Sequence, residues 1–329
     1  MAYHQSSRLG VIGALIGSLL FTGCAERRET DKQIQDPIQL EMAIASWQQS
    51  KIEPMVRAME QLNEATGLFL RSPTIESRST WRSAWISAHD SFLGASILYS
   101  PDNFQRIDAW PIEAGFLDSL PNYPGSGIVS DDTLEITPTS LEEQHQITDE
   151  SEVALGFHVL EYYAFDRTME DFAKGAPNFR KRQRLVQRVA ELLQTDIASL
   201  VQAQETGPEV NQGSYSQLLL KIQRRLQRVF SEFNLLGEHS PYSDWSSQNV
   251  RTQLGAIAEL LEEPVDLNHF LINLNPESAQ TFNETLLEAH TLLPPRGQPD
   301  EAASSRLVLL IASLSQQLGD FITMLPAEG

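Results

Sequence analysis

Apolar residues recur at intervals of three and four along almost the whole chain after Pro37, which is the spacing of one face of an α-helix. Stretches in which apolar and polar residues alternate, as a half-buried strand requires, are scarce. The pattern therefore predicts an all-α protein of about eight helices. We expect these helices at residues 38–62, 75–98, 140–165, 179–204, 214–236, 246–262, 276–293 and 301–325.

Helices of this kind bury their apolar faces by packing into bundles. Residues 205–214 interrupt the helical pattern with Gly and Pro and are the best candidate for a domain boundary. We therefore expect an N-terminal helical bundle over residues 38–205 and a C-terminal helical bundle over residues 206–329. Residues 99–139 are rich in Pro, Gly and Asp and too long for a simple connection, so we expect this stretch to be partly ordered.

The first 23 residues have the features of a bacterial secretion signal. Arg8 precedes an apolar run over residues 9–21, which is shorter than the roughly 20 residues that a transmembrane helix needs. The run leads to Leu-Phe-Thr-Gly-Cys at residues 20–24, which resembles a lipobox and implies cleavage before Cys24 and lipidation of that residue. The alternative is an ordinary cleaved signal followed by an incidental cysteine.

Lipidation would place the mature protein on a membrane surface, because several acyl chains anchor stably where one does not. Residues 24–37 are polar and charged, which is typical of a tether. Ala25 favours the outer membrane, by resemblance to Gram-negative lipoproteins. We expect a protein of the bacterial cell envelope that is anchored through lipid on Cys24 and faces the periplasm.

The chain carries 44 Asp and Glu against 24 Lys and Arg, a net charge of −20. This balance excludes a bulk basic surface for nucleic acid. It is compatible with a solvated acidic surface, which we favour, or with a protein that handles cations. Basic residues gather in the helix expected over 214–236, where we expect them to form a solvated face: Lys221, Arg224, Arg225 and Arg228.

The segment Gly156-Phe-His-Val-Leu-Glu161 is the strongest candidate for a functional site. His158 and Glu161 are three residues apart, so on a helix they share one face and can both reach one metal ion. Their neighbours are almost all apolar, which predicts burial, and buried polar groups need partners. Two interpretations remain at this point: a metal or ligand site, or a hydrogen bond between His158 and Glu161 within the core.

Other chemistry has little support in the sequence. The motifs Walker A, GxGxxG, GxSxG, HExxH and HxxEH are absent, and the single cysteine excludes both cysteine catalysis and an intrachain disulfide. The remaining histidines lie in polar or amphipathic contexts and are not expected to form a cluster with ligand spacing: His145, His239, His269 and His290.

The run over residues 152–166 resembles the GxHxxE signature of the imelysin-like family, the iron-regulated proteins of the bacterial envelope. Further segments resemble the family in the same order, at residues 81–92, 107–111, 116–118, 184–196 and 240–244. The resemblance implies two four-helix bundles packed side by side, with a site near their interface. It also implies a role in iron uptake or metal homeostasis. Members carry a peptidase label, which no established metalloprotease motif supports in this chain.

We predict that His158 and Glu161 hold a metal ion together with unidentified carboxylates, and that Gly156 belongs to the same motif. A mixture of imidazole and carboxylate suits iron, our first choice, or zinc. The alternatives are a metal-dependent peptidase of the imelysin type and a non-catalytic scaffold in an iron-uptake assembly. Partners would be the membrane and iron-uptake or redox proteins of the envelope.

Four more residues are candidates to line this site. His89 stands where the family often has Arg and is either an extra ligand or an exposed helix residue, of which we favour exposure; Asp90 follows it. Asp108 is a candidate to line the site, whereas the neighbouring Trp110 is expected to plug the end of the bundle core. Ser243 either donates a hydrogen bond across the interface or caps the helix that begins near residue 245.

Overall fold

The computed structural model describes residues 35–99, 104–120, 122–206, 214–234, 239–294 and 297–325. The predicted signal peptide (1–23), the lipidation site Cys24 and most of the tether (24–37) lie outside these residues. The expected domain boundary falls next to residues 207–213, which also lie outside them, so the division into two domains stays a prediction.

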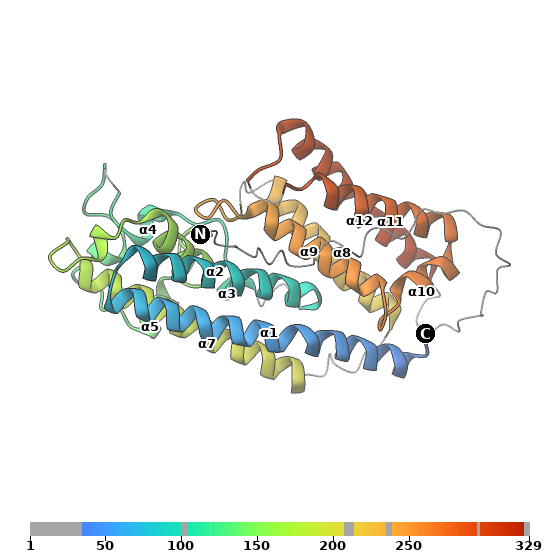
Figure 1. Ribbon diagram of the computed structural model, residues 1–329, viewed down its shortest axis with the longest axis horizontal. Coiled ribbons are helices and arrows are strands. Elements are labelled where there is room, and N and C mark those ends of the chain that lie inside the picture. The colour runs from blue at the N-terminus through green and yellow to red at the C-terminus, as the bar shows by residue number, and fades with distance from the viewer. Residues whose placement is uncertain are drawn as a thin grey trace, which may run out of the picture. The chain divides into compact units, whose positions relative to one another are not determined.

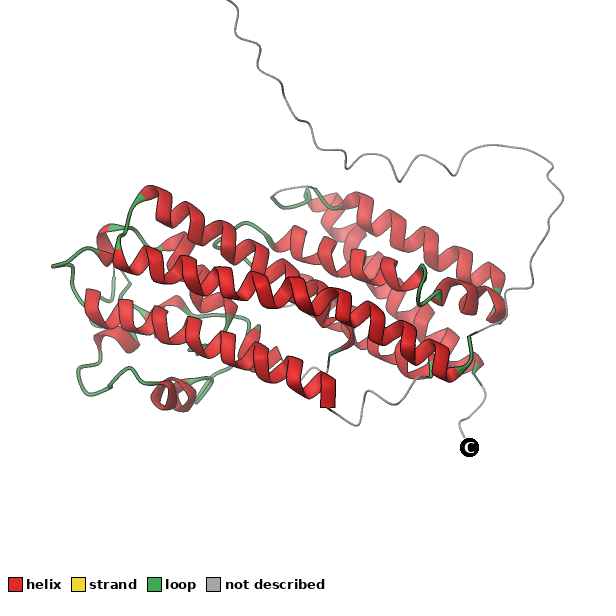
Figure 2. Cartoon of the chain, turned by 60° about the horizontal axis from the view of Figure 1, so that its bottom comes forward, coloured by secondary structure: helices red, strands yellow, loops and turns green. Residues whose placement is uncertain are grey.

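Every regular element in the described ranges is helical, and none of those residues belongs to a named strand (Figure 2). The prediction of an all-α fold is therefore confirmed, while its arrangement as two four-helix bundles stays a prediction. The long helices are α1 (Pro37–Arg71), α2 (Ile75–Ala95), α7 (Phe179–Thr206), α8 (Tyr215–Asn234), α9 (Ser246–Leu261), α11 (Pro276–Leu292) and α12 (Glu301–Met324). The short helices are α3 (Phe104–Ile107), α4 (Ala114–Leu117), α5 (Pro138–Gln144), α6 (Phe157–Glu161) and α10 (Leu267–Leu274).

The helix α1 contributes to two clusters of buried apolar side chains. It begins with a capping box, in which Asp36 and Gln39 each accept a hydrogen bond from the backbone N–H of the other. Its first turns, with Trp47, pack against side chains of α8 to α12. From Met55 onward it packs against α2 and α7, beside which it runs in Figure 1. One continuous helix thus takes part in both halves of the core.

The helix α12 is long and apolar enough to cross a membrane by length and composition. Its buried face lies in the second cluster, however, against α8 and α11. Packing in the core of the fold accounts for its apolar composition. The buried residues on this face are Leu307, Leu310, Ile311, Leu314, Leu318 and Phe321.

The irregular stretch 99–139 contains α3, α4 and a 3₁₀ turn over Ile128–Ser130. A buried ion pair connects it to α7, since Arg182 Nη2 lies 2.9 Å from Asp118 Oδ1 and both side chains are almost fully buried. The stretch is therefore held against a long helix, which places the residues after α3 in the interior.

The prediction of one helix over residues 140–165 is wrong for the central part of that range. The helix α5 ends at Gln144, and residues 145–156 form turns in which Asp149 and Glu152 accept hydrogen bonds from nearby backbone N–H groups. Such local bonds compete with a helix. Gly156 then adopts φ 90°, which no helix contains, before α6 begins. A π-helical turn over Tyr162–Asp166 follows α6.

Candidate metal centre

Four buried side chains from four separate segments meet in the core. His89 comes from α2, Asp108 follows α3, His158 lies in α6, and His239 precedes α9. Their exposed fractions are 0, 0, 0 and 4 %. One nitrogen or oxygen atom of each lies within 4.8 Å of those of the other three. We refer to these four residues as the His/Asp cluster.

Asp108 is the centre of the cluster because its carboxylate contacts all three imidazoles. Its Oδ1 lies 2.8 Å from His89 Nε2 and 3.2 Å from His158 Nε2, and its Oδ2 lies 3.4 Å from His239 Nε2. The Nε2 atoms of His158 and His239 are 3.3 Å apart. Three imidazole nitrogens therefore converge on one carboxylate, which is a donor set that iron or zinc accepts.

Two buried polar atoms of the cluster lack hydrogen-bond partners. They are Nδ1 of His89 and Oδ2 of Asp108. Buried polar groups in folded proteins are nearly always satisfied, so such atoms call for an explanation. A metal ion in the cluster would supply a partner for Asp108 Oδ2, while His89 faces Asp108 through its other nitrogen, Nε2. The donors present thus fit a bound cation.

Gly156 allows α6 to approach the segment that carries Asp108. A Cβ atom at this position would lie 2.6 Å from the carbonyl oxygen of Ile107 and 2.7 Å from that of Arg106. The indole of Trp85 on α2 donates a 2.8 Å hydrogen bond to the carbonyl oxygen of Phe157 and fixes the start of the helix. Close backbone approach at a glycine thus brings His158 within reach of Asp108.

Glu161 occupies the layer behind His158. Its Oε2 lies 2.8 Å from His158 Nδ1, while its Oε1 accepts hydrogen bonds from the backbone N–H (2.9 Å) and hydroxyl (2.7 Å) of Ser243. A carboxylate in this position fixes the orientation of an imidazole whose other nitrogen can bind a metal. The prediction that Glu161 is itself a ligand stays a prediction, because its contacts in this structure are hydrogen bonds.

A polar side chain also contacts the other ring nitrogen of His239, the one that faces away from Asp108. The Nδ1 of His239 lies 3.2 Å from Nδ2 of Asn249, which also donates to the Ser240 hydroxyl at 2.6 Å. The Oδ1 of Asn249 is buried without a partner. Rotation of this amide by 180° would offer that oxygen to a protonated Nδ1 and leave Nε2 free for a metal.

Two arginines of α8 adjoin the cluster. The guanidinium groups of Arg225 and Arg228 lie 4.4 and 4.2 Å from the ring centre of Phe104. Arg228 donates a 3.0 Å hydrogen bond to the Asp108 carbonyl oxygen and pairs with Glu232. The expectation of a solvated basic face is wrong for Arg225, which is 4 % exposed, because it stacks on a buried aromatic ring.

The electrostatics of the cluster couple its members. Burial by itself lowers the pKa of His158, but hydrogen bonds with Asp108 and Glu161 outweigh it and raise the pKa to about 9. Burial raises the pKa of Asp108, but the neighbouring His239 and His89 hold the pKa well below its usual range. His89 keeps a lowered pKa because burial dominates there. At neutral pH, His158 is therefore protonated and Asp108 is ionised.

The structure brings together some of the predicted site residues and separates others. His158, Asp108 and His89 meet, and the expectation that His89 is exposed is wrong because that face of α2 packs against α6. Asp90 points elsewhere and accepts a hydrogen bond from Trp245. Ser243 donates to Glu161, while α9 has no side-chain cap at residue 245.

Trp110 does more than fill the end of the core. Its ring centre lies 5.2 Å from that of His158 and 6.1 Å from that of His239, so it lines the cluster. His239 itself was missed, and the expectation that it joins no cluster is wrong. Its position in the sequence could have identified it as a site residue, because it directly precedes the segment 240–244 that resembles the imelysin-like pattern.

Comparisons with known proteins identify one family and two similar folds. A model of the imelysin family matches residues 49–317. The fold is similar to a putative iron-regulated protein A precursor from Parabacteroides distasonis ATCC 8503, with 14 % identity, a TM-score of 0.67 and coverage of 90 % of this chain and 97 % of that one. An imelysin-like protein from Psychrobacter arcticum 273-4 has 15 % identity, a TM-score of 0.61 and coverage of 86 % and 94 %. No curated protein matches the chain.

Proposed function

The chain belongs to the imelysin family, and from this premise we propose that it binds a metal ion at the His/Asp cluster, iron first and zinc second, as part of iron uptake or metal homeostasis in the bacterial envelope. The observation that carries the proposal is the convergence of three imidazoles on the Asp108 carboxylate in the protein interior. His89, Asp108, His158 and His239 would hold the ion, and Glu161 would orient His158.

The chemistry of the donors supports a transition metal. Three neutral imidazoles and one carboxylate suit divalent iron or zinc better than magnesium or calcium, which prefer oxygen ligands throughout. His158, whose pKa is raised to about 9, releases a proton when its Nε2 binds the ion. The guanidinium of Arg228 beside Asp108 adds positive charge and favours a divalent over a trivalent ion.

The burial of the His/Asp cluster favours a role in metal binding over a role in peptide hydrolysis. A hydrolytic metal keeps an open position that the substrate can reach. The four ligand side chains are between 0 and 4 % exposed, which gives a polypeptide no access to them in this conformation. We therefore place storage, transfer or sensing of the ion ahead of a peptidase reaction.

The cellular setting of the proposal comes from the sequence. Lipid on Cys24 and the polar residues 24–37 would hold the helical part at a membrane surface, facing the periplasm and preferably at the outer membrane. Partners there would be iron-uptake or redox proteins of the envelope. The similar protein from Parabacteroides distasonis is described as iron-regulated, which is consistent with this setting.

A metal titration with graded variants tests the proposal. We expect the wild type to bind one Fe²⁺ or Zn²⁺, His158→Ala to lose binding, and Glu161→Gln to weaken it by about 10- to 100-fold, which is typical for a group behind the ligand. His290→Ala serves as the matched control, because this half-buried histidine lies outside the cluster. Metal content is measured by mass spectrometry and affinity by competition with a chelator.

Equal metal content in the wild type, His158→Ala and His290→Ala would remove the site. A loss of the same size in Glu161→Gln and His158→Ala would instead make Glu161 a ligand, as the spacing of the motif first predicted.

The pH dependence of binding follows from the proton on His158. Because its pKa is raised to about 9, the imidazole is protonated at pH 7, and the metal must displace that proton. We expect the apparent affinity for Zn²⁺ to rise about tenfold per pH unit between pH 7 and about 9 and to level off above that, because His158 releases its proton when the ion binds. Calorimetry in buffers of different ionisation enthalpy measures the released proton directly. An affinity that is constant from pH 7 to 9 would contradict the assignment.

A further inference from the structure

A cavity of about 450 Å³ lies between α1, α2 and α9. The residues Pro54, Asp90, Gly94, Thr252 and Gly255 are part of its wall, and none of them belongs to the His/Asp cluster. Its volume is within the range of small-molecule sites. The three helices that form it are long, so the wall is fixed by the core of the fold.

The cavity exists because small residues face it. A Cβ atom built on Gly255 meets no atom within 4 Å, and one built on Gly94 meets only the methyl group of Thr252 at 3.6 Å. Glycine in the middle of a helix lowers its stability relative to alanine, and neither position has a backbone conformation that requires glycine. The space is thus kept open at two positions where a side chain would fit.

Asp90 provides a carboxylate without a cationic partner at the wall. Both of its oxygens lie within 3.1 Å of the indole Nε1 of Trp245, and the hydroxyl of Thr252 donates to it as well. These donors are neutral, and no ion pair connects Asp90 to a described Lys, Arg or His side chain. A mostly buried carboxylate without a countercharge favours a ligand that brings one.

Other groups of the lining are acceptors too. Pro54 lies inside α1 and has no N–H, so the carbonyl oxygen of Ser50 loses its usual helical partner next to the cavity. Glu259 adds a second carboxylate, which pairs with Lys51 and accepts a 3.1 Å hydrogen bond from the Trp47 indole. Two carboxylates against one ammonium leave the lining with a negative balance.

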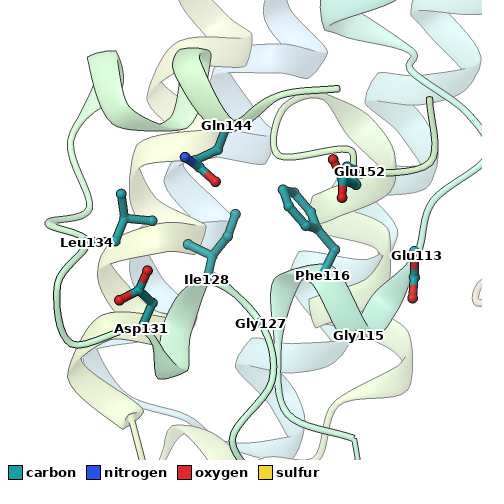
Figure 3. A pocket seen from close by; sticks show the side chains of 9 residues that line it. All are labelled: Glu113, Gly115, Phe116, Gly127, Ile128, Asp131, Leu134, Gln144 and Glu152. Carbon is teal, nitrogen blue, oxygen red and sulfur yellow. The ribbon is translucent and has the colours of Figure 1, made fainter. Parts of the chain in front are cut away.

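Another cavity lies among residues of the segment 113–152, away from Asp90. Figure 3 shows this space of about 340 Å³, where Phe116, Ile128 and Leu134 point inward. Its carboxylates Asp131 and Glu152 accept hydrogen bonds from Thr133 and Thr148, and Asp131 is exposed to solvent whereas Glu152 is half-buried. It therefore provides control positions for the cavity at Asp90.

We propose that the cavity between α1, α2 and α9 binds a small molecule that carries a protonated amine, whose ammonium group pairs with Asp90. The carbonyl oxygen of Ser50 and the carboxylate of Glu259 accept further N–H groups of the ligand. The site is separate from the metal centre, because Asp90 and His89 are neighbours in sequence but face different sides of α2.

Fluorine NMR of the protein labelled with 5-fluorotryptophan tests this directly. The Trp245 signal, assigned as the one absent in Trp245→Phe, reports on the indole that bonds to Asp90. We expect 1,4-diaminobutane to shift this signal with saturation, and the neutral isostere 1,4-butanediol to leave it unchanged. Asp90→Asn should weaken the binding at least about tenfold.

The variant Gly255→Leu fills the cavity with a side chain while leaving Asp90 and the fold unchanged. It therefore tests whether the amine binds in the cavity. The added side chain has room and improves helix propensity, so the melting temperature should not fall, while amine binding should weaken at least about tenfold. Glu152→Gln, at the other cavity, should bind the amine as the wild type does. No saturable shift with 1,4-diaminobutane, equal binding in Gly255→Leu, or an equal shift with the diol or with Mg²⁺ would overturn the proposal.

Discussion

Replacement of Asp108 by asparagine is expected to lower the affinity for Fe²⁺ or Zn²⁺ by at least about a hundredfold. Asp108 supplies the one carboxylate of the His/Asp cluster and contacts each of the three histidines. Asparagine has nearly the same shape, so the helices should stay folded, but its amide carries no charge and binds a cation weakly. Competition with a chromophoric chelator measures the affinity, and circular dichroism checks the fold.

The matched control for this prediction is Asp131→Asn. This carboxylate is exposed and lies on the rim of the other cavity, so its replacement removes the same charge without touching the cluster. We expect it to bind metal like the wild type. An affinity of Asp108→Asn within about threefold of the control would mean that the cluster is not the binding site.

Replacement of Gly156 by alanine is expected to destabilise the protein by about 3–5 kcal/mol. Gly156 has φ 90° and ψ −172°, a conformation that is costly for any residue with a Cβ atom. In addition, the new Cβ would lie 2.6 and 2.7 Å from two carbonyl oxygens of the segment before Asp108. Relief of this overlap would move α6 away from Asp108, so metal affinity should fall together with stability. Urea unfolding measures the loss.

The variant Gly175→Ala separates the cost of backbone strain from the cost of steric overlap. Gly175 also has a positive φ, 104°, but a Cβ there meets no atom within 4 Å. It should therefore suffer only the backbone strain, about 1 kcal/mol, and bind metal normally. If Gly156→Ala were as stable as Gly175→Ala, the close approach of α6 to the Asp108 segment would not be what this glycine provides.

The periodicity of apolar residues predicted most of the helices because the faces that pack in the core are continuous in sequence. The helix expected over 179–204 corresponds to α7 (Phe179–Thr206), and that over 276–293 to α11 (Pro276–Leu292). The prediction from periodicity is wrong between Gln144 and Gly156. There, polar side chains form hydrogen bonds with nearby backbone N–H groups, and the positive φ of Gly156 changes the direction of the chain. Periodicity also did not reveal α10, an eight-residue helix that is too short to show a clear period.

The candidate site was only half predictable, for a physical reason. Gly156, His158 and Glu161 form one local pattern, so their sequence identifies them. His89 and His239 are 150 residues apart, and only the packing of α2 against the segment before α9 brings them to the same place. Arg225 was assigned to solvent for the same reason, since its partner Phe104 belongs to a short helix distant in sequence.

The most direct measurement of the central claim is anomalous X-ray scattering from crystals of the protein grown with Fe²⁺ or Zn²⁺, recorded on both sides of the absorption edge of the metal. We predict one dominant anomalous peak at about 2.0–2.3 Å from the Nε2 atoms of His89, His158 and His239 and from a carboxylate oxygen of Asp108. This peak should disappear in Asp108→Asn. A metal peak elsewhere in the protein, and none at the His/Asp cluster, would contradict the account.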